Sequence, residues 1–359
     1  MDPTKPFNEL PELPPKINLE TYNVLKKLID ANKNLAELKG LAALIPNQAI
    51  LIQVLGLFEA KVSSEIENIV TTNDKLYKAF HDINQNIDSY TKEVLKYQDA
   101  LWFGFNEIKY KKRLLNTPFF EEIVQVLLDS RSEIRKIPGT KLINSLGEVV
   151  YTPPETEKLI RDKLQNLEKF IYSENSLDPL IKLALIHYQF EAIHPFYDGN
   201  GRTGRIINIL YLVDQKLLDL PILYLSKYII DHKKDYYQKL RNVSLLEKWE
   251  EWILFILDAV ISTSIITKNK ILSILDLIKK SEELIKNKLP KIFSKELLDL
   301  LFKHPYCKIK FLEDAKIAHR QTASLYLKQL EKIGFLKSIK KGKDIYYLNH
   351  EFFDLLTKN

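Results

Sequence analysis

Residues 194–205 read His-Pro-Phe-Tyr-Asp-Gly-Asn-Gly-Arg-Thr-Gly-Arg, and the segments on both sides have the pattern of α-helices. Upstream, Asp178-Pro179 is typical of a helix cap followed by a first-turn proline, and apolar residues follow it. Downstream, residues 206–212 are rich in Ile and Leu and resume a helical pattern. The sequence therefore predicts a loop that leaves one helix and opens the next.

This loop combines side chains suited to phosphate chemistry. His194 can accept a proton, Asp198 can hold a hard cation, and residues 199–201 form a small-residue turn at a predicted helix N-terminus. The first N–H groups of a helix have no internal partner and face a positive dipole end, so such a turn binds anions. Arg202 and Arg205 share one helix face and can clamp phosphate oxygens. Each feature alone is more often structural, but their combination at this spacing favours a functional site.

The whole stretch resembles the motif of the Fic family, H-P-F-x-[DE]-G-N-G-R-x-x-R, and every fixed position matches. The resemblance implies transfer of AMP from ATP to a Ser, Thr or Tyr hydroxyl of a target protein, or of the chain itself, with release of pyrophosphate. It implies His194 as the general base and Asp198 as the Mg²⁺ ligand. The residues that it implies for nucleotide binding are Gly199, Asn200, Gly201, Arg202, Thr203, Gly204 and Arg205.

A second stretch, at the end of the helix predicted for about residues 48–68, resembles an inhibitory motif of the same family, [ST]-x-x-x-E-[GN]. Ser63, Glu67 and Asn68 match it. In the family the glutamate pairs with the second arginine of the motif, here Arg205. A carboxylate there would occupy the fork that the γ-phosphate needs and would repel that phosphate.

Two further features are similar to those of Fic proteins. Residues 140–154 read as a β-hairpin before the motif, where the family has a flap that docks its target by adding a strand. Tyr237 corresponds to a tyrosine near the adenine, although a tyrosine at helical spacing is as often part of the core.

Composition predicts a mainly α protein of more than one domain. The chain has 359 residues with only ten Gly, and Leu, Ile and Lys are abundant. We expect an N-terminal helical region at 1–110, a Fic-type helical bundle with a small hairpin flap at 111–289, and a third domain at 290–359. The expected helices include 75–85, 119–136, 246–267 and 268–288.

The absence of a signal-peptide pattern at the start, together with the single Cys307, favours a soluble cytoplasmic protein with no membrane contact.

Residues 290–359 have the pattern of a winged helix-turn-helix, with helices near 294–303, 312–317 and 321–334 before a wing hairpin. Residues 291–359 hold fourteen Lys and Arg against eight Asp and Glu, so the whole net charge of +6 falls in this segment. Two interpretations stay open. The module contacts DNA, or it is a protein–protein or dimerisation module that would make the chain a homodimer. The candidate DNA contacts are Arg320, Gln321, Thr322 and Lys328.

Two functions compete with AMP transfer. One is a DNA-binding transcriptional regulator whose Fic half senses a nucleotide. The other is removal of AMP from modified proteins, with the inhibitory glutamate activating water. The sequence names neither the target protein nor its modified residue.

Overall fold

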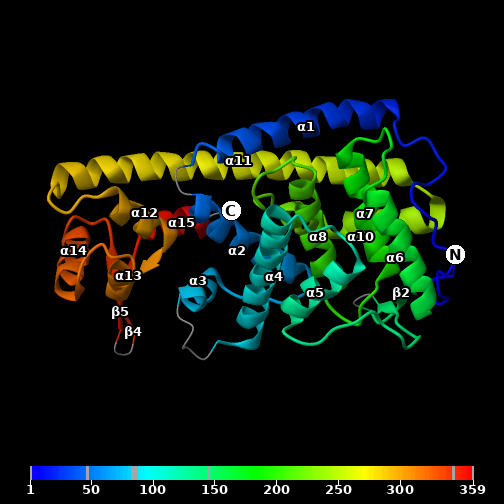
Figure 1. Ribbon diagram of the computed structural model, residues 1–359, viewed down its shortest axis with the longest axis horizontal. Coiled ribbons are helices and arrows are strands. Elements are labelled where there is room, and N and C mark those ends of the chain that lie inside the picture. The colour runs from blue at the N-terminus through cyan, green and yellow to red at the C-terminus, as the bar shows by residue number, and fades with distance from the viewer. Residues whose placement is uncertain (1, 46–47, 82–86, 144–145, 342–343, 358–359) are drawn as a thin grey trace.

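The computed structural model describes residues 2–45, 48–81, 87–143, 146–341 and 344–357, and its described part is mainly helical (Figure 1). The helices of the first two predicted domains are α1 (Tyr22–Ala42), α2 (Gln48–Ile66), α3 (Asn73–His81), α4 (Ser89–Lys111), α5 (Thr117–Leu128), α6 (Glu157–Ile171), α7 (Pro179–Ile193), α8 (Asn200–Asp214), α9 (Leu225–Asp231), α10 (Lys233–Leu246) and α11 (Trp249–Lys288). The C-terminal helices are α12 (Lys295–Lys303), α13 (Ile309–Asp314), α14 (Arg320–Lys332) and α15 (His350–Thr357). The strands are β1 (Leu142–Ile143), β2 (Val149–Tyr151), β3 (Tyr306–Cys307), β4 (Lys337–Lys341) and β5 (Asp344–Leu348).

Short polar side chains start the core helices. Asp88 accepts a hydrogen bond from the Thr91 N–H at the start of α4, and Asn116 does the same for α5. Asp178 caps α7, whose first residue is the proline expected there. Such caps satisfy N–H groups that have no partner within the helix.

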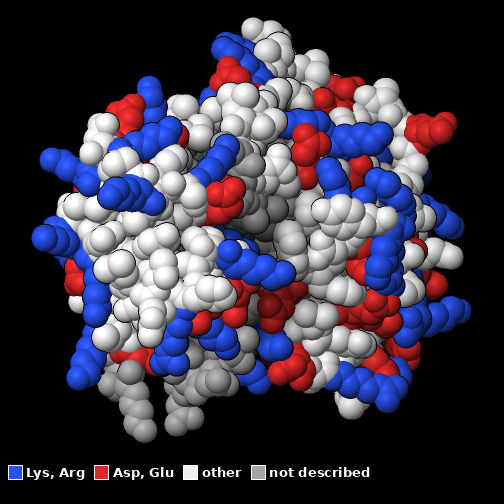
Figure 2. Space-filling view, turned by 60° about the vertical axis from the view of Figure 1, so that its left-hand side comes forward, with Lys and Arg blue, Asp and Glu red and all other residues white. Residues whose placement is uncertain are grey.

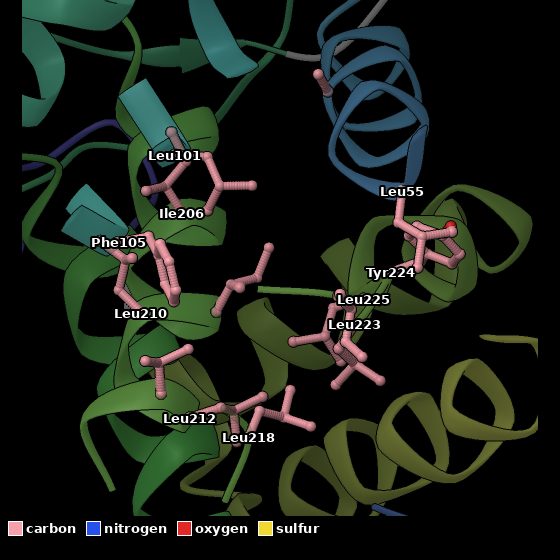
Figure 3. Close-up of a cluster of buried hydrophobic side chains, with 14 of the residues drawn as sticks. Leu55, Leu101, Phe105, Ile206, Leu210, Leu212, Leu218, Leu223, Tyr224 and Leu225 are labelled. Carbon is pink, nitrogen blue, oxygen red and sulfur yellow. The ribbon is translucent and has the colours of Figure 1, made fainter. Parts of the chain in front are cut away.

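Helix α8 lies in the middle of the core, in contact with α4, α5 and α7. Leu101 and Phe105 of α4 face Ile206 and Leu210 of α8 (Figure 3). A Cβ atom on Gly104 would clash with the Leu210 side chain, so this glycine lets α4 and α8 approach closely. The packing fixes the axis of α8 and therefore the direction of its N-terminus.

Helices α1 and α11 run side by side along one edge of the molecule (Figure 1). The two helices predicted at 246–267 and 268–288 are wrong as separate elements, because α11 is continuous from Trp249 to Lys288. No Pro or Gly interrupts this stretch, so nothing local ends the helix. Trp252 of α11 is buried and donates from Nε1 to the Ala184 carbonyl at 2.7 Å, which ties α11 to α7.

Two other predicted helices differ from the structure. The helix expected at 119–136 ends at Leu128, since Asp129 takes a left-handed conformation with φ of 52°. The helix expected at 75–85 is α3, and residues 82–86 lie outside the described part of the chain.

The predicted hairpin is confirmed, apart from residues 144–145, which lie outside the described residues. Strands β1 and β2 pair antiparallel, with Leu142 opposite Tyr151. The N-terminal segment runs beside the hairpin exit, where the Phe7 N–H donates to the Thr152 carbonyl at 2.9 Å.

The C-terminal module has the element order expected for a winged helix-turn-helix, and its strands form one sheet in the order β3-β5-β4. The loop residues 342–343 lie outside the described part. The sequence did not predict β3 or α15. These two elements dock the module, since the Tyr306 hydroxyl donates to Asp74 of α3 at 2.6 Å and the Phe353 ring lies 5.7 Å from the Tyr77 ring.

Helix α12 also contacts α2. Among the described residues, no helix has the length and apolar character needed to cross a membrane.

Candidate active site

His194 ends α7 in a strained conformation. It is the C-cap residue, with φ of 48° and ψ of 60°, and its N–H donates to the Phe190 carbonyl at 3.1 Å. Non-glycine residues rarely adopt the left-handed region, and they persist there only where the surroundings enforce it. The turn swings the chain out of α7 and begins the loop that leads to α8.

Asn200 holds the loop in shape. Its Oδ1 accepts from the Phe196 N–H and its Nδ2 donates to the Phe196 carbonyl, both at 2.8 Å. The Phe196 ring is buried 6.3 Å from the Phe190 ring. Gly199, with φ of 77°, provides the turn into α8. The role of Asn200 in this geometry is therefore to fix the loop from within.

Asp198 and Arg202 lie close to each other at the start of α8 but differ in exposure. The Asp198 side chain is 75% exposed, and one of its oxygens accepts from the Gly199 N–H at 2.6 Å. Arg202 is almost fully buried and donates to Glu93 of α4 at 3.1 Å, with Asp198 at 3.9 Å. An exposed carboxylate thus stands beside a buried guanidinium at the start of α8.

Arg205 meets the end of α2. Its side chain is 2% exposed, and its Nε donates to the Ser63 hydroxyl at 2.7 Å. Its Nη2 donates both to the Ser63 carbonyl at 2.9 Å and to Glu67 Oε1 at 2.7 Å. The predicted pair of Glu67 and Arg205 is therefore formed in the structure, and Ser63 contributes two acceptors to the same guanidinium.

The Glu67 carboxylate lies against the first turn of α8. A Cβ atom built on Gly201 would clash with Glu67 Oε1 and lie 3.0 Å from Arg205 Nη1. Gly201 therefore leaves open the space over the helix N-terminus, and in this structure the carboxylate fills it. A carboxylate in that place is a model for the anion that the turn can bind.

The end of α2 explains the third residue of the inhibitory motif. Asn68 has φ of 63°, and its N–H donates to the Glu65 carbonyl at 3.0 Å. Asn tolerates this left-handed position, which keeps the helix from continuing beyond Ile66 and leaves Glu67 in the turn that follows. Lys233 then donates to the last carbonyl of α2, that of Ile66, at 2.6 Å.

Charges and burial set the ionisation of the site. Burial alone would raise the pKa of Glu67, but the Arg205 charge and hydrogen bond outweigh it, so this pKa is lowered. Burial would lower the pKa of Arg205, yet the carboxylate of Glu67 raises it overall. Burial, followed by the Arg135 charge, lowers the pKa of His194 to about 4. The imidazole is thus neutral at pH 7 and able to accept a proton.

Asp198 fits a Mg²⁺ ion that is held mainly by its substrate. Its exposed carboxylate has one oxygen outside the Gly199 hydrogen bond, and Mg²⁺ typically takes one or two carboxylates together with water and phosphates. The described residues contain no cluster of three or more His, Cys, Asp or Glu that would hold a metal without a ligand.

Three family models match the chain and cover most of it. They are "Fic/DOC family N-terminal" over residues 25–106, "Fic/DOC family" over 113–212, and "Protein adenylyltransferase SoFic-like, C-terminal domain" over 277–352. The second of these contains the loop from His194 to Arg205. The chain belongs to the Fic/DOC family.

Relatives of this Fic chain match over short stretches. "Probable protein adenylyltransferase aq_aa38" of Aquifex aeolicus is 34% identical over 79 residues, which is 22% of this chain and 24% of that protein. "Protein adenylyltransferase Fic" of Drosophila grimshawi is 50% identical over 46 residues, 12% of this chain and 10% of that protein. The Fic chain thus spans a quarter or less of the length of these curated relatives.

Solved structures share the fold over a wider range. A Fic family protein from Desulfovibrio desulfuricans G20 aligns with a TM-score of 0.59 and 17% identity, over 93% of this chain and 97% of that one. Fic-1 from C. elegans aligns with a TM-score of 0.53 and 17% identity, over 72% and 76% of the two chains.

Several predicted contacts of the Fic chain remain predictions. Thr203 is fully buried. A Cβ on Gly204 would lie 2.6 Å from Glu191 Oε1, so Gly204 faces α7. Tyr237 of α10 is about half exposed, with its ring 5.1 Å from that of Tyr236. The candidate DNA contacts are exposed at the start and on one side of α14: Arg320, Gln321, Thr322 and Lys328.

The sequence did not single out four charged residues that structure the site. Glu93 pairs with Arg202, and Glu191 lies against α8 with its pKa raised to about 7 by burial. Glu59 of α2 is buried and accepts from Ser226 and Tyr97, and Arg135 contacts the backbone of the His194 loop. Glu191 could have been noticed as a charged residue among apolar neighbours. Nothing local connects Glu59 with Ser226, Glu93 with Arg202, or Arg135 with the His194 loop.

Proposed function

We propose that this Fic chain is a protein adenylyltransferase that moves AMP from ATP to a hydroxyl side chain of a target protein. The observation that supports this most is the pairing of the Glu67 carboxylate with Arg205 over the start of α8. A carboxylate that this guanidinium binds over the helix N-terminus supports the binding of a terminal phosphate at the same position. The relatives named as protein adenylyltransferases carry the same activity in their names.

The reaction that we propose follows from the residues around this anion-binding position. The hydroxyl oxygen of the target attacks the α-phosphorus, and the bond from that phosphorus to the bridging oxygen of pyrophosphate breaks. His194, which is neutral at pH 7, takes the hydroxyl proton. Arg202, Arg205 and the N–H groups at the start of α8 stabilise the charge on the phosphates.

Mg²⁺ bound at Asp198 would neutralise charge on the α- and β-phosphates and help to orient them. The target itself would lie along the hairpin of β1 and β2, whose Ile143 is exposed, through added main-chain hydrogen bonds. Such contacts do not demand one fixed target sequence.

We also propose that Glu67 restrains the enzyme. The γ-phosphate would need the Arg205 fork that Glu67 and Ser63 occupy, so ATP binds productively only when Glu67 leaves. The pairing is an internal competitor, and its removal should raise activity.

The test is incubation with α-labelled ATP and Mg²⁺, with cell lysate as a source of targets. We compare wild type, Glu67→Gly and the double variant Glu67→Gly/His194→Ala. We expect weak labelling of protein by wild type, strong labelling by Glu67→Gly and none by the double variant. Mass spectrometry should find AMP on a hydroxyl residue of the target or of the chain itself.

Two other outcomes of this assay would contradict AMP transfer or favour a different reaction. A Glu67→Gly protein that binds ATP but labels nothing in lysate contradicts AMP transfer. Release of AMP from modified protein by the wild type, with loss of this release in Glu67→Gly, would favour removal of AMP.

The nucleic-acid alternative has less support from the surface. Figure 2 is turned so that the left-hand side of Figure 1 comes forward. On the face that it shows, Lys and Arg are interspersed with Asp and Glu rather than gathered into one patch. A salt-dependent shift of DNA mobility in a gel that requires Lys328 would support the DNA-binding alternative.

A further inference from the structure

Arg135 is a buried cation whose hydrogen bonds go to backbone carbonyls. Its Nε donates to the His194 carbonyl at 2.8 Å and its Nη2 to that of Ile193 at 3.2 Å. Nη2 also donates to the Pro154 carbonyl, and the Arg135 N–H donates to the Pro195 carbonyl at 2.9 Å. Within the described part of the chain, no carboxylate lies at ion-pair distance from this guanidinium.

A buried charge of this kind is costly. Removing an ion from water without a counter-ion costs several kcal/mol, and a core that needed only to pack would use an apolar residue. The residue is fully buried, and its Nη1 has no hydrogen-bond partner among the residues that the structure describes. A role at the carbonyls that it contacts would account for a buried charge at this place.

Those carbonyls belong to the end of α7 and to the turn after it. The last carbonyls of a helix have no partner within it and carry the negative end of the helix dipole. Arg135 satisfies the carbonyls of Ile193 and His194 and compensates the dipole there. It thus stabilises the left-handed conformation of His194, which glycine adopts readily but histidine rarely does.

The same guanidinium connects this turn to the flap. Pro154 follows the hairpin of β1 and β2, and its carbonyl shares Nη2 with that of Ile193. One side chain therefore fixes the distance between the segment that would hold the target and the residue that would take its proton.

The Arg135 charge also acts on the imidazole. The groups that face the imidazole are Arg135, whose charge lowers the pKa of His194, and the carboxylates of Glu67 and Asp198, which raise it. The Glu191 backbone also raises this pKa, and burial is the largest cause lowering it.

We propose that Arg135 is a positioning residue that fixes the His194 turn against the flap exit and so holds the imidazole in place for its role as a base. This inference rests on the proposed adenylyltransferase function. Arg135 touches no reacting atom and acts through His194.

The experiment uses the full chain with Glu67→Gly as the parent. We compare Arg135→Met, Arg135→Lys and Arg131→Met, the last being a matched control because the Arg131 side chain is 87% exposed on the same segment. Labelling rates at saturating ATP are measured across pH, ATP affinity is measured by calorimetry, and the His194 imidazole is titrated by NMR.

We expect Arg135→Met to lower the labelling rate by about 10- to 100-fold, the cost of a misplaced catalytic group, while ATP affinity stays within about threefold. Retained affinity also shows that the variant is folded. The imidazole should titrate at higher pH in Arg135→Met, whereas Arg135→Lys should keep the parent titration and recover part of the rate. Arg131→Met should match the parent.

An Arg135→Met protein with the parent rate and the parent imidazole titration overturns the proposal. So does a rate loss that is explained entirely by weaker ATP binding. If Arg135→Met does not fold, an Arg135→Lys protein with the rate of the parent overturns the positioning role. If the parent labels nothing, the proposed function fails instead, and the NMR titration still shows whether the Arg135 charge acts on His194.

Discussion

Replacing Glu67 with Gln should strengthen ATP binding by an amount that the structure bounds. The change keeps the size of the side chain but removes the charge that pairs with Arg205 at 2.7 Å. A hydrogen bond to a charged group contributes about 1.5–3 kcal/mol. Because the Glu67 side chain is partly exposed, solvent screening reduces this to about 1–2 kcal/mol. Each 1.4 kcal/mol is tenfold in affinity, so ATP should bind roughly 5- to 30-fold more tightly.

Calorimetry with ATP and Mg²⁺ measures this directly. Every protein in the comparison carries His194→Ala, so that no turnover disturbs the titration. The matched control is Glu65→Gln, which removes the same charge from the same helix end, where Glu65 has no ion pair within the described residues. We expect its ATP affinity to equal that of the parent.

One result would refute the reasoning. If Glu67→Gln and Glu65→Gln both bind ATP within twofold of the parent, the pair with Arg205 does not compete with the nucleotide. A strengthening of the same size in both variants would mean that only the general charge of the helix end matters.

Three further changes test the surroundings of the site. Glu59→Gln should stabilise the protein by about 3 kcal/mol at pH 8 and hardly at pH 5, because burial raises the pKa of Glu59 from 4.5 to about 7 and this carboxyl costs stability as pH rises through that window. Asn200→Ala should lower the free energy of unfolding by about 1–3 kcal/mol, because two buried backbone groups of the loop lose their partner. Phe353→Ala should loosen the contact of α15 with Tyr77 and raise labelling by wild type, but should not raise it further in Glu67→Gly.

Each of these has its own measurement. Urea unfolding at pH 5 and pH 8 tests Glu59→Gln. A stabilisation that is equal at the two pH values would contradict the prediction. Urea unfolding at one pH tests Asn200→Ala. The control is Asn242→Ala, because Asn242 is partly exposed on α10 and its side chain bonds to the side chains of Gln238 and Glu251 rather than to buried backbone groups. Labelled ATP reads the third, and an equal rise in both backgrounds would mean that the C-terminal module does not act through Glu67.

The motif loop could be predicted from the sequence because its information is local. The cap at Asp178, the turn residues and the apolar run after Arg205 lie within forty positions of one another, and each fixes a backbone feature. The pairing of Glu67 with Arg205 spans 138 positions, and it was predicted through a family resemblance rather than through local pattern.

Other features could not be found in this way. The absence of Pro and Gly permits one continuous helix α11, but the contacts of α11 with α1 and α7 are not contained in a window of its own sequence. The early end of α5 depends on one left-handed residue, Asp129, a conformation that Asp adopts only in some contexts. The role of Arg135 could not be predicted from the sequence for a related reason. Its hydrogen-bond partners are backbone carbonyls, and every residue has one.

Helix α2 connects the site to the rest of the molecule, because one of its faces contacts the core and another contacts α11. Toward the core, Glu59 accepts from Ser226 of α9 and Tyr97 of α4, and toward α11 the Phe58 ring lies 4.7 Å from the Lys270 ammonium. That ammonium also donates to the Leu356 carbonyl of α15 at 3.2 Å. The last turn of α2 is held separately, by Ser63 on Arg205 and by Lys233 on the Ile66 carbonyl. The contacts of Lys270 with Phe58 and Leu356 therefore link α2 to the C-terminal module, and they give the module a physical route to the nucleotide site.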